Sequence, residues 1–252
     1  MTRTCMITGA TSGIGKAIAY AFAKNGDNVV ITGRRKEQLE TIKKDLETSY
    51  SINVTLAVFD VTNVEEVIEQ CQQIMKEVGQ VDVLVNNAGL ALGLDKFQEY
   101  DLADMLTMID TNVRGLLTVT RQILPQMVEN NNGHIINIGS TAGIYAYASA
   151  AVYAATKSAV KVLSDGIRID TIDKNIKVTT LQPGIVETDF SQVRFHGDKE
   201  RAATVYQGID ALQAEDIANC TIFITNQPAH VQISDMTIMA TKQATGFTIH
   251  RE

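Results

Sequence analysis

The stretch CMITGATSGIGKAIAYAFAK, residues 5–24, decides the fold class of this chain. Its first four residues carry no charge, which predicts a short buried strand. Glycines follow at Gly9, Gly13 and Gly15, and Lys16–Lys24 has apolar residues at helical spacing. A glycine turn between a strand and a helix lets a pyrophosphate approach the backbone at the helix N-terminus. The pattern predicts a dinucleotide-binding unit, although its spacing differs from the standard Gly-x-Gly-x-x-Gly and a tight turn without a ligand is the alternative.

The rest of the chain alternates strands with helices. We expect strands at Val29–Thr32, Val54–Phe59, Asp82–Asn86, His134–Ile138, Ile176–Leu181 and Ile233–Met239. We expect helices at Lys36–Thr48, Val64–Val78, Leu102–Asn130 and Ala148–Thr171. Pro125 should end or kink the third of these helices. This alternation predicts an α/β fold, a Rossmann-type doubly wound parallel sheet, and the lack of a linker or repeat predicts one domain over residues 1–252.

Composition narrows the class of protein. The chain has 252 residues, of which 45% are hydrophobic, and no apolar run is long enough to span a membrane. The net charge of −7 argues against nucleic acid as a partner. The three cysteines and four histidines lack the spacing of disulfides or metal ligands, so we expect no metal site. With no signal-peptide core at the N-terminus, a cytoplasmic protein without membrane contact is expected.

Tyr153 and Lys157 carry the clearest chemical signal. They stand four residues apart in a helical segment, so they share one face of that helix. A nearby ammonium group favours the phenolate and should lower the pKa of the phenol, which is normally about 10. Tyr153 would then serve as an acid/base group near neutral pH. Ser140, thirteen residues upstream of Tyr153, could hold a substrate oxygen beside the phenol.

These residues, together with Asn86–Gly89 and Pro183-Gly184, resemble the short-chain dehydrogenase/reductase family over nearly the whole chain. The resemblance implies four catalytic residues, Asn112, Ser140, Tyr153 and Lys157. It implies that the cofactor is bound by Gly9, Thr11, Ser12, Gly13, Ile14, Gly15, Asp60, Val61, Asn87, Ala88, Gly89, Tyr153, Lys157, Pro183, Gly184, Val186 and Thr188. It also implies that Lys157 holds the nicotinamide ribose and that Asn112 holds a water for proton relay.

The end of the second strand indicates which cofactor is used. A site for NAD usually has an acidic residue here, to bind the ribose 2′-hydroxyl. This chain has Gly33 at that place, followed by Arg34 and Arg35. Arginine offers a permanently charged donor fork to a 2′-phosphate. NADP is therefore expected, and a solvated basic turn is the alternative.

A closer resemblance points to the substrate. The segments Thr32–Arg35, Asn86–Gly93, Gly133–Gly143, Phe190–Phe195 and Pro228–Val231 are similar to the NADP-dependent 3-hydroxy acid dehydrogenases, described as serine 3-dehydrogenases or malonic semialdehyde reductases. This implies a small-molecule substrate bound by Ser140, Tyr153 and Arg194, with Arg194 pairing with its carboxylate. A surface or interface role is the alternative for Arg194.

Two other functions stay open at this stage. One is a reductase of the same family that acts on a 3-oxoacyl thioester or a diketone, which would not need a carboxylate-binding arginine. The other is a nucleotide-sensing module without activity, which would be expected to lack Tyr153 or Lys157. The family resemblance also implies a homotetramer assembled through the helices Leu102–Asn130 and Ala148–Thr171, which are rich in small and apolar residues.

Overall fold

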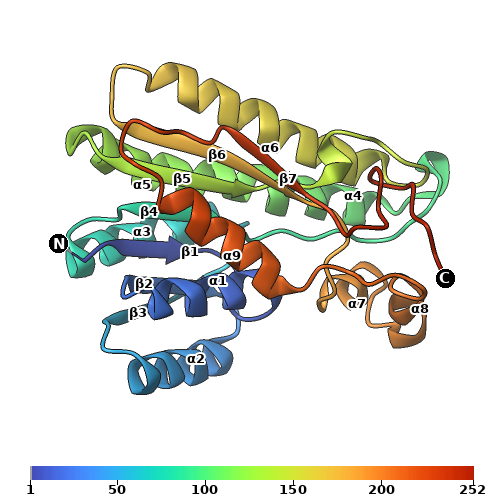
Figure 1. The fold of residues 1–252 in the computed structure, drawn as a ribbon, viewed down its shortest axis with the longest axis horizontal. Coiled ribbons are helices and arrows are strands. Elements are labelled where there is room, and N and C mark those ends of the chain that lie inside the picture. The colour runs from blue at the N-terminus through green and yellow to red at the C-terminus, as the bar shows by residue number, and fades with distance from the viewer. Residues whose placement is uncertain (1) are drawn as a thin grey trace.

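The computed structural model describes residues 2–252. Its seven parallel strands form one sheet in the order β3-β2-β1-β4-β5-β6-β7 (Figure 1). The strands are β1 Thr4–Ile7, β2 Asn28–Gly33, β3 Val54–Val58, β4 Val83–Asn86, β5 Gly133–Ile138, β6 Ile176–Pro183 and β7 Asp235–Ile238. The order proceeds from β1 to one edge and from β4 to the other, which confirms the doubly wound Rossmann-type fold.

Helices cover both faces of this sheet. They are α1 Gly13–Lys24, α2 Lys36–Ser49, α3 Val64–Val78, α4 Leu102–Ile109, α5 Leu116–Glu129, α6 Ala151–Asp170, α7 Phe190–Arg194, α8 Lys199–Thr204 and α9 Ala214–Thr225. Buried residues of α1, α2 and α9 form a core on one face, and those of α3 and α5 form a core on the other, where α6 also packs. Helices α7 and α8 lie apart from both layers, beyond the end of the sheet (Figure 1).

The two cores follow from the alternation of side chains along each strand. In β1, Cys5 and Ile7 point into the core of α1, α2 and α9, whereas Met6 points into the core of α3 and α5. All three side chains are fully buried. Because both faces are covered, the strands carry apolar residues at nearly every position. This explains why charge-free runs predict them.

The predicted helix Leu102–Asn130 is divided in the structure. Helices α4 and α5 are joined by a π-helical turn, Asp110–Gly115, that carries Asn112. The expectation that Pro125 ends the helix is wrong, because α5 continues to Glu129. The carbonyl that a proline leaves without an N–H partner belongs here to Arg121, which is exposed, so solvent can satisfy it.

Two other predicted elements are shorter than expected. Helix α6 begins at Ala151 rather than Ala148, because Ser149 adopts a left-handed backbone with φ +63°. Strand β7 spans only Asp235–Ile238, since it pairs with β6 over four residues. Within residues 2–252 no helix is long and apolar enough to cross a bilayer, and all three cysteines are free.

Candidate active site

A cleft of about 420 Å³ lies at the carboxyl ends of the strands, where ligands bind in doubly wound sheets. Most of the residues predicted to bind the cofactor or the substrate line it: Gly9, Thr11, Ser12, Gly13, Ile14, Arg34, Arg35, Asp60, Val61, Asn87, Ala88, Gly89, Ser140, Tyr153, Lys157, Pro183, Gly184, Val186 and Thr188. Gly15, Asn112 and Arg194 are not part of the lining and make the contacts described below.

The glycine loop is held against the end of β4. Gly9 has φ +68° and Gly13 has φ +51°, values that L-residues with a side chain rarely adopt. The Asn87 side chain donates to the carbonyls of Thr8 and Gly9 at 2.9 and 3.2 Å. A Cβ at Gly15 would lie 2.4 Å from both Asn87 Nδ2 and the Gly9 carbonyl oxygen, so only glycine fits there. Gly15 therefore packs against the glycine loop and Asn87, and it does not line the cleft.

The first turn of α1 meets the cleft with free amide groups. The N-cap residue is Ser12, and its side chain does not bond to that turn. Uncapped N–H groups at a helix N-terminus bind anions, and a pyrophosphate is the anion that a dinucleotide brings.

Two arginines line the cleft at the end of β2. Arg34 forms an ion pair with Asp60, with 3.3 Å between Nη1 and Oδ2. Arg35 Nη2 donates to the hydroxyls of Thr11 and Ser12 at 2.6 and 2.8 Å. No acidic residue stands at Gly33, so positive charge dominates this end of the cleft.

Lys157 is buried on α6 beside Tyr153. Its Nζ donates to the carbonyl of Ile138 at 2.8 Å and lies 6.0 Å from the centroid of the Tyr153 ring. Burial lowers the pKa of Lys157 to about 8, because the charged form loses its hydration. Lys157 is therefore a weaker cation than an exposed lysine would be at neutral pH.

The pKa of Tyr153 differs from the expectation. Burial raises it to about 12, and the Ser140 hydroxyl and the Arg194 guanidinium lower it without cancelling that effect. The guanidinium carbon of Arg194 lies 5.2 Å from the ring centroid, closer than the Lys157 ammonium. The proposed effect of Lys157 on this pKa stays a prediction, and of the two cations beside the ring Arg194 is the nearer.

Asn112 lies beneath the cleft, in the π-helical turn. Its amide nitrogen donates to the Leu90 carbonyl at 2.8 Å and to the Thr156 hydroxyl at 3.0 Å, and its oxygen accepts from the Leu90 amide at 2.8 Å. A Cβ at Gly89 would lie 3.2 Å from Asn112 Oδ1 and 3.5 Å from Lys157 Nζ. Glycine at this position leaves space between the amide oxygen and the ammonium.

Arg194, at the end of α7, packs on the ring of Tyr153. Its guanidinium packs over the rings of Tyr153 and Phe190, at 5.2 and 5.3 Å from their centroids, and donates to the Tyr147 hydroxyl at 3.2 Å. Its carbonyl accepts from the Gly93 amide at 2.8 Å. The structure thus brings Arg194 together with Tyr153, as the sequence-based hypothesis requires.

An apolar wall borders Tyr153. Ala91, Met108, Ala142 and Tyr153 form a small buried cluster, against which Leu90, Leu92, Tyr100, Tyr147, Val152 and Phe190 pack. Phe190 was not assigned to this site from the sequence, although its ring centroid lies 5.8 Å from that of Tyr153. Its signal was available, because Phe190 stands two residues after Thr188, which is among the predicted cofactor-binding residues.

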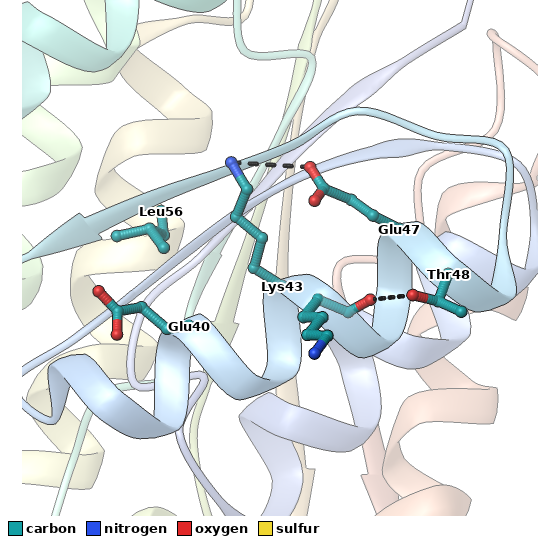
Figure 2. Close-up of a pocket in the computed structure, with 6 residues that line it drawn as sticks. Glu40, Lys43, Glu47, Thr48 and Leu56 are labelled. Atoms are coloured by element: carbon teal, nitrogen blue, oxygen red, sulfur yellow. Dashed lines mark hydrogen bonds and ion pairs between the residues drawn. The ribbon is translucent and has the colours of Figure 1, made fainter.

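A second hollow lies far from these residues, on the outer side of α2. Figure 2 shows its lining of Glu40, Lys43, Lys44, Glu47, Thr48 and Leu56, with Lys43 and Glu47 forming an ion pair at 3.6 Å. Glu40 pairs instead with Lys36, at 3.7 Å, and none of the lining residues belongs to the predicted site. Among residues 2–252 no cluster of three or more His, Cys, Asp or Glu side chains is arranged to hold a metal ion.

Comparison with known proteins agrees with this site. Residues 3–199 match the family model described as short chain dehydrogenase. The chain is 44% identical over 248 residues to the NADP-dependent 3-hydroxy acid dehydrogenase of Salmonella typhi, and the match covers 98% of each chain. It is 39% identical over 251 residues to the NADP-dependent 3-hydroxy acid dehydrogenase of Schizosaccharomyces pombe, covering 99% of this chain and 97% of that one.

A solved structure gives the same result in three dimensions. The closed form of serine dehydrogenase complexed with NADP+ superimposes with a TM-score of 0.92 at 42% identity. The match covers 99% of this chain and 100% of that chain. The similarity therefore extends through the helices α7 and α8 and the C-terminal segment.

Proposed function

The chain belongs to the short-chain dehydrogenase family, and from this membership and its site we propose that it is an NADP-dependent oxidoreductase acting on short 3-hydroxy acids. It transfers a hydride between the nicotinamide and the 3-hydroxyl carbon, with serine, 3-hydroxypropionate or similar acids as substrates, or reduces the matching semialdehyde. The single observation that carries the choice of substrate is the position of Arg194 over the Tyr153 ring.

The residues of the cleft fit NADP. The uncapped first turn of α1 and the glycine loop suit a pyrophosphate, and Arg34 and Arg35 supply positive charge where a 2′-phosphate would lie. Asp60 and Val61 would border the adenine, and Lys157 would hold the nicotinamide ribose. When bound, NADP supplies the hydride acceptor, and NADPH the hydride donor.

The chain's own residues handle the proton. Ser140 holds the substrate oxygen beside the Tyr153 phenol. In oxidation, Tyr153 accepts the hydroxyl proton, and in reduction it donates a proton to the carbonyl oxygen. The space left by Gly89 between Asn112 and Lys157 suits a water that relays this proton toward solvent.

Arg194 reads the substrate carboxylate. A guanidinium is a permanent cation with a planar donor fork, which matches a carboxylate. Because it packs against the ring of the proton-transferring tyrosine, the charged end of the substrate and its reacting carbon must be close together. A 3-hydroxy acid has this short separation, whereas a long acyl thioester or a neutral diketone offers no carboxylate to bind.

We extend the proposal to assembly and location. Exposed apolar residues form a stripe along α4 and α5, at Leu102, Leu106, Ile109 and Leu117, and another on α6, at Val162 and Ile169. A subunit interface would bury both stripes, and their exposure in the single chain supports a homotetramer. Three free cysteines suit a reducing compartment, which supports a cytoplasmic location.

The test is a substrate screen in which the absorbance of NADPH reports turnover. We expect turnover of 3-hydroxypropionate, serine or 3-hydroxybutanoate with NADP, and about tenfold or more lower kcat/KM for the methyl ester of each, since the ester has no carboxylate and a charge-assisted pair is lost. A preference for neutral diketones or thioesters would instead support another reductase of the same family.

A further inference from the structure

The guanidinium of Arg194 has few hydrogen-bond partners of its own. Its guanidinium carbon lies 5.2 Å from the ring centroid of Tyr153 and 5.3 Å from that of Phe190, and neither ring supplies a hydrogen-bond acceptor to the donor fork. Its Nε is buried and has no hydrogen-bond partner among residues 2–252. The Tyr147 hydroxyl, 3.2 Å from Nη2, is the only side-chain or backbone acceptor that the described residues give to this guanidinium.

That single hydrogen bond fixes the fork in its plane. Packing against aromatic rings does not fix the direction of the donor fork, and an acceptor at one nitrogen restricts this freedom. Tyr147 is well placed for this task, because it lies between Ser140 and Tyr153 in the segment that joins β5 to α6. The orientation of Arg194 is thereby tied to the segment that carries the catalytic hydroxyls.

The Tyr147 hydroxyl can still donate one hydrogen bond. Because its oxygen accepts from Arg194, its own proton is available for donation. The other tyrosine near this guanidinium, Tyr100, already donates its proton to the Leu92 carbonyl. The nearest carboxylate on α4, Asp104, is 3.0 Å from His196 Nε2. Tyr147 is thus the tyrosine whose hydroxyl can still donate a hydrogen bond to a carboxylate bound at Arg194.

We propose that Tyr147 is a specificity-determining residue: its hydroxyl orients the Arg194 guanidinium and donates a second hydrogen bond to the substrate carboxylate. The proposal rests on the proposed function, in which Arg194 binds that carboxylate. Tyr147 and Arg194 then act as one unit, which discriminates acids from neutral substrates while Tyr153 exchanges the proton.

The test compares Tyr147→Phe with Tyr145→Phe, a matched control in the same segment whose side chain is 44% exposed. The substrates are 3-hydroxybutanoate and its methyl ester, and the readout is the ratio of their kcat/KM values. We expect Tyr147→Phe to lower the ratio about tenfold or more, since a hydrogen bond to a charged group commonly contributes a decade or more in binding. Tyr145→Phe should leave the ratio within about twofold of the unmodified enzyme, as exposed substitutions usually do.

A double-mutant cycle tests whether Tyr147 acts on the acid-to-ester ratio together with Arg194. In an Arg194→Ala background, Tyr147→Phe should lower the acid-to-ester ratio much less than it does alone, because the two residues are coupled. The melting temperature and the NADPH dissociation constant, measured by fluorescence, should stay close to those of the unmodified protein. An equal loss for acid and ester with a lower melting temperature would show that Tyr147 only packs, and would overturn the proposal.

The outcomes separate this proposal from the proposed function. If the unmodified enzyme does not prefer the acid, or if Arg194→Ala leaves the ratio unchanged, the proposed function fails. If the unmodified enzyme prefers the acid and Arg194→Ala lowers the ratio, but Tyr147→Phe leaves the ratio unchanged, only the inference about Tyr147 fails. Should Tyr147→Phe not fold, Tyr147→Leu also lacks the hydroxyl, and the same two results support or overturn the proposal.

Discussion

At Tyr153, burial and charge act in opposite directions. Burial raises the pKa to about 12, whereas the Arg194 guanidinium and the Ser140 hydroxyl favour the phenolate. The neutral phenol therefore predominates at neutral pH in this structure, and this is the form that donates a proton in reduction. Oxidation requires the phenolate, so its rate should increase with pH.

Tyr153→Phe tests the role of the phenol oxygen. The substitution keeps the ring against Phe190 and Arg194 and removes only the group that exchanges a proton. Turnover should fall by roughly 10² to 10⁴, the usual contribution of a general acid or base. NADPH binding, measured by fluorescence titration, should change little. Activity within a few-fold of the unmodified enzyme would remove Tyr153 from the mechanism.

Arg34→Asp tests the choice of cofactor. Arg34 is largely exposed, and its partner Asp60 lies on the neighbouring strand end, so a carboxylate at position 34 would repel a 2′-phosphate. The unmodified enzyme should prefer NADP to NAD by at least about tenfold in kcat/KM, and the variant should lose or reverse this preference. Equal efficiency with both cofactors before mutation would show that Arg34 and Arg35 form a solvated turn.

Residue types and spacing predicted Tyr153, Lys157, Ser140 and the glycine loop, because strands of a parallel sheet all deliver their carboxyl ends to one edge. They did not predict which cation acts on Tyr153. Lys157 is the sequence neighbour, yet its ammonium is directed to the Ile138 carbonyl, and Arg194 arrives from a separate helix. Such a distance depends on tertiary packing, which sequence spacing does not encode.

At the scale of elements, β5 and β6 bury a histidine between them. His134 Nε2 lies 2.9 Å from the Thr179 hydroxyl, and burial lowers the pKa of His134 to about 3. A histidine in an unfolded chain titrates near 6.5. Below that pH the unfolded chain binds a proton that the folded chain does not bind, so the free energy of unfolding should fall by up to about 1.4 kcal/mol per pH unit from this group.

His134→Gln isolates this effect, because glutamine does not titrate. Urea unfolding at several pH values between about 6.5 and 4 should show a weaker loss of stability in the variant than in the unmodified protein. At pH 7 the variant should be the less stable of the two, since the bond to Thr179 and the packing are altered. Parallel pH profiles would mean that His134 does not stay neutral in the folded state.

The long helical stretch contains a turn that the sequence did not predict. Its apolar spacing predicted helix from Leu102 to Asn130, and helical turns do fill that range. The π-helical turn at Asp110–Gly115 was not predicted, because one widened turn scarcely changes the apolar pattern. The turn lies against a distant part of the chain. Gly115 packs so closely on Val61 that a Cβ at position 115 would lie 2.9 Å from Val61 Cγ2.

At the scale of the whole molecule, the exposed apolar stripes on α4, α5 and α6 predict a homotetramer. Val162 and Ile169 are 68% and 70% exposed in the single chain, which is unfavourable unless a second subunit covers them. Light scattering at micromolar concentration should report four subunits. Val162→Glu combined with Ile169→Glu should produce smaller species, whereas Val64→Glu on α3 should not. A monomer before mutation would contradict the prediction.

The central claim needs several distant parts of the chain to converge: Tyr153 on α6, Arg194 on α7 and the cofactor loop after β1. The most direct test is the ratio of kcat/KM for 3-hydroxybutanoate to that for its methyl ester, measured with NADP before and after Arg194→Ala. Any effect of Arg194 on Tyr153 is common to both substrates and cancels in the ratio. We predict that the ratio falls by about tenfold or more, because the charge-assisted pair that distinguishes acid from ester is lost. An equal loss for acid and ester would contradict the account, since Arg194 would then shape the site without reading the carboxylate.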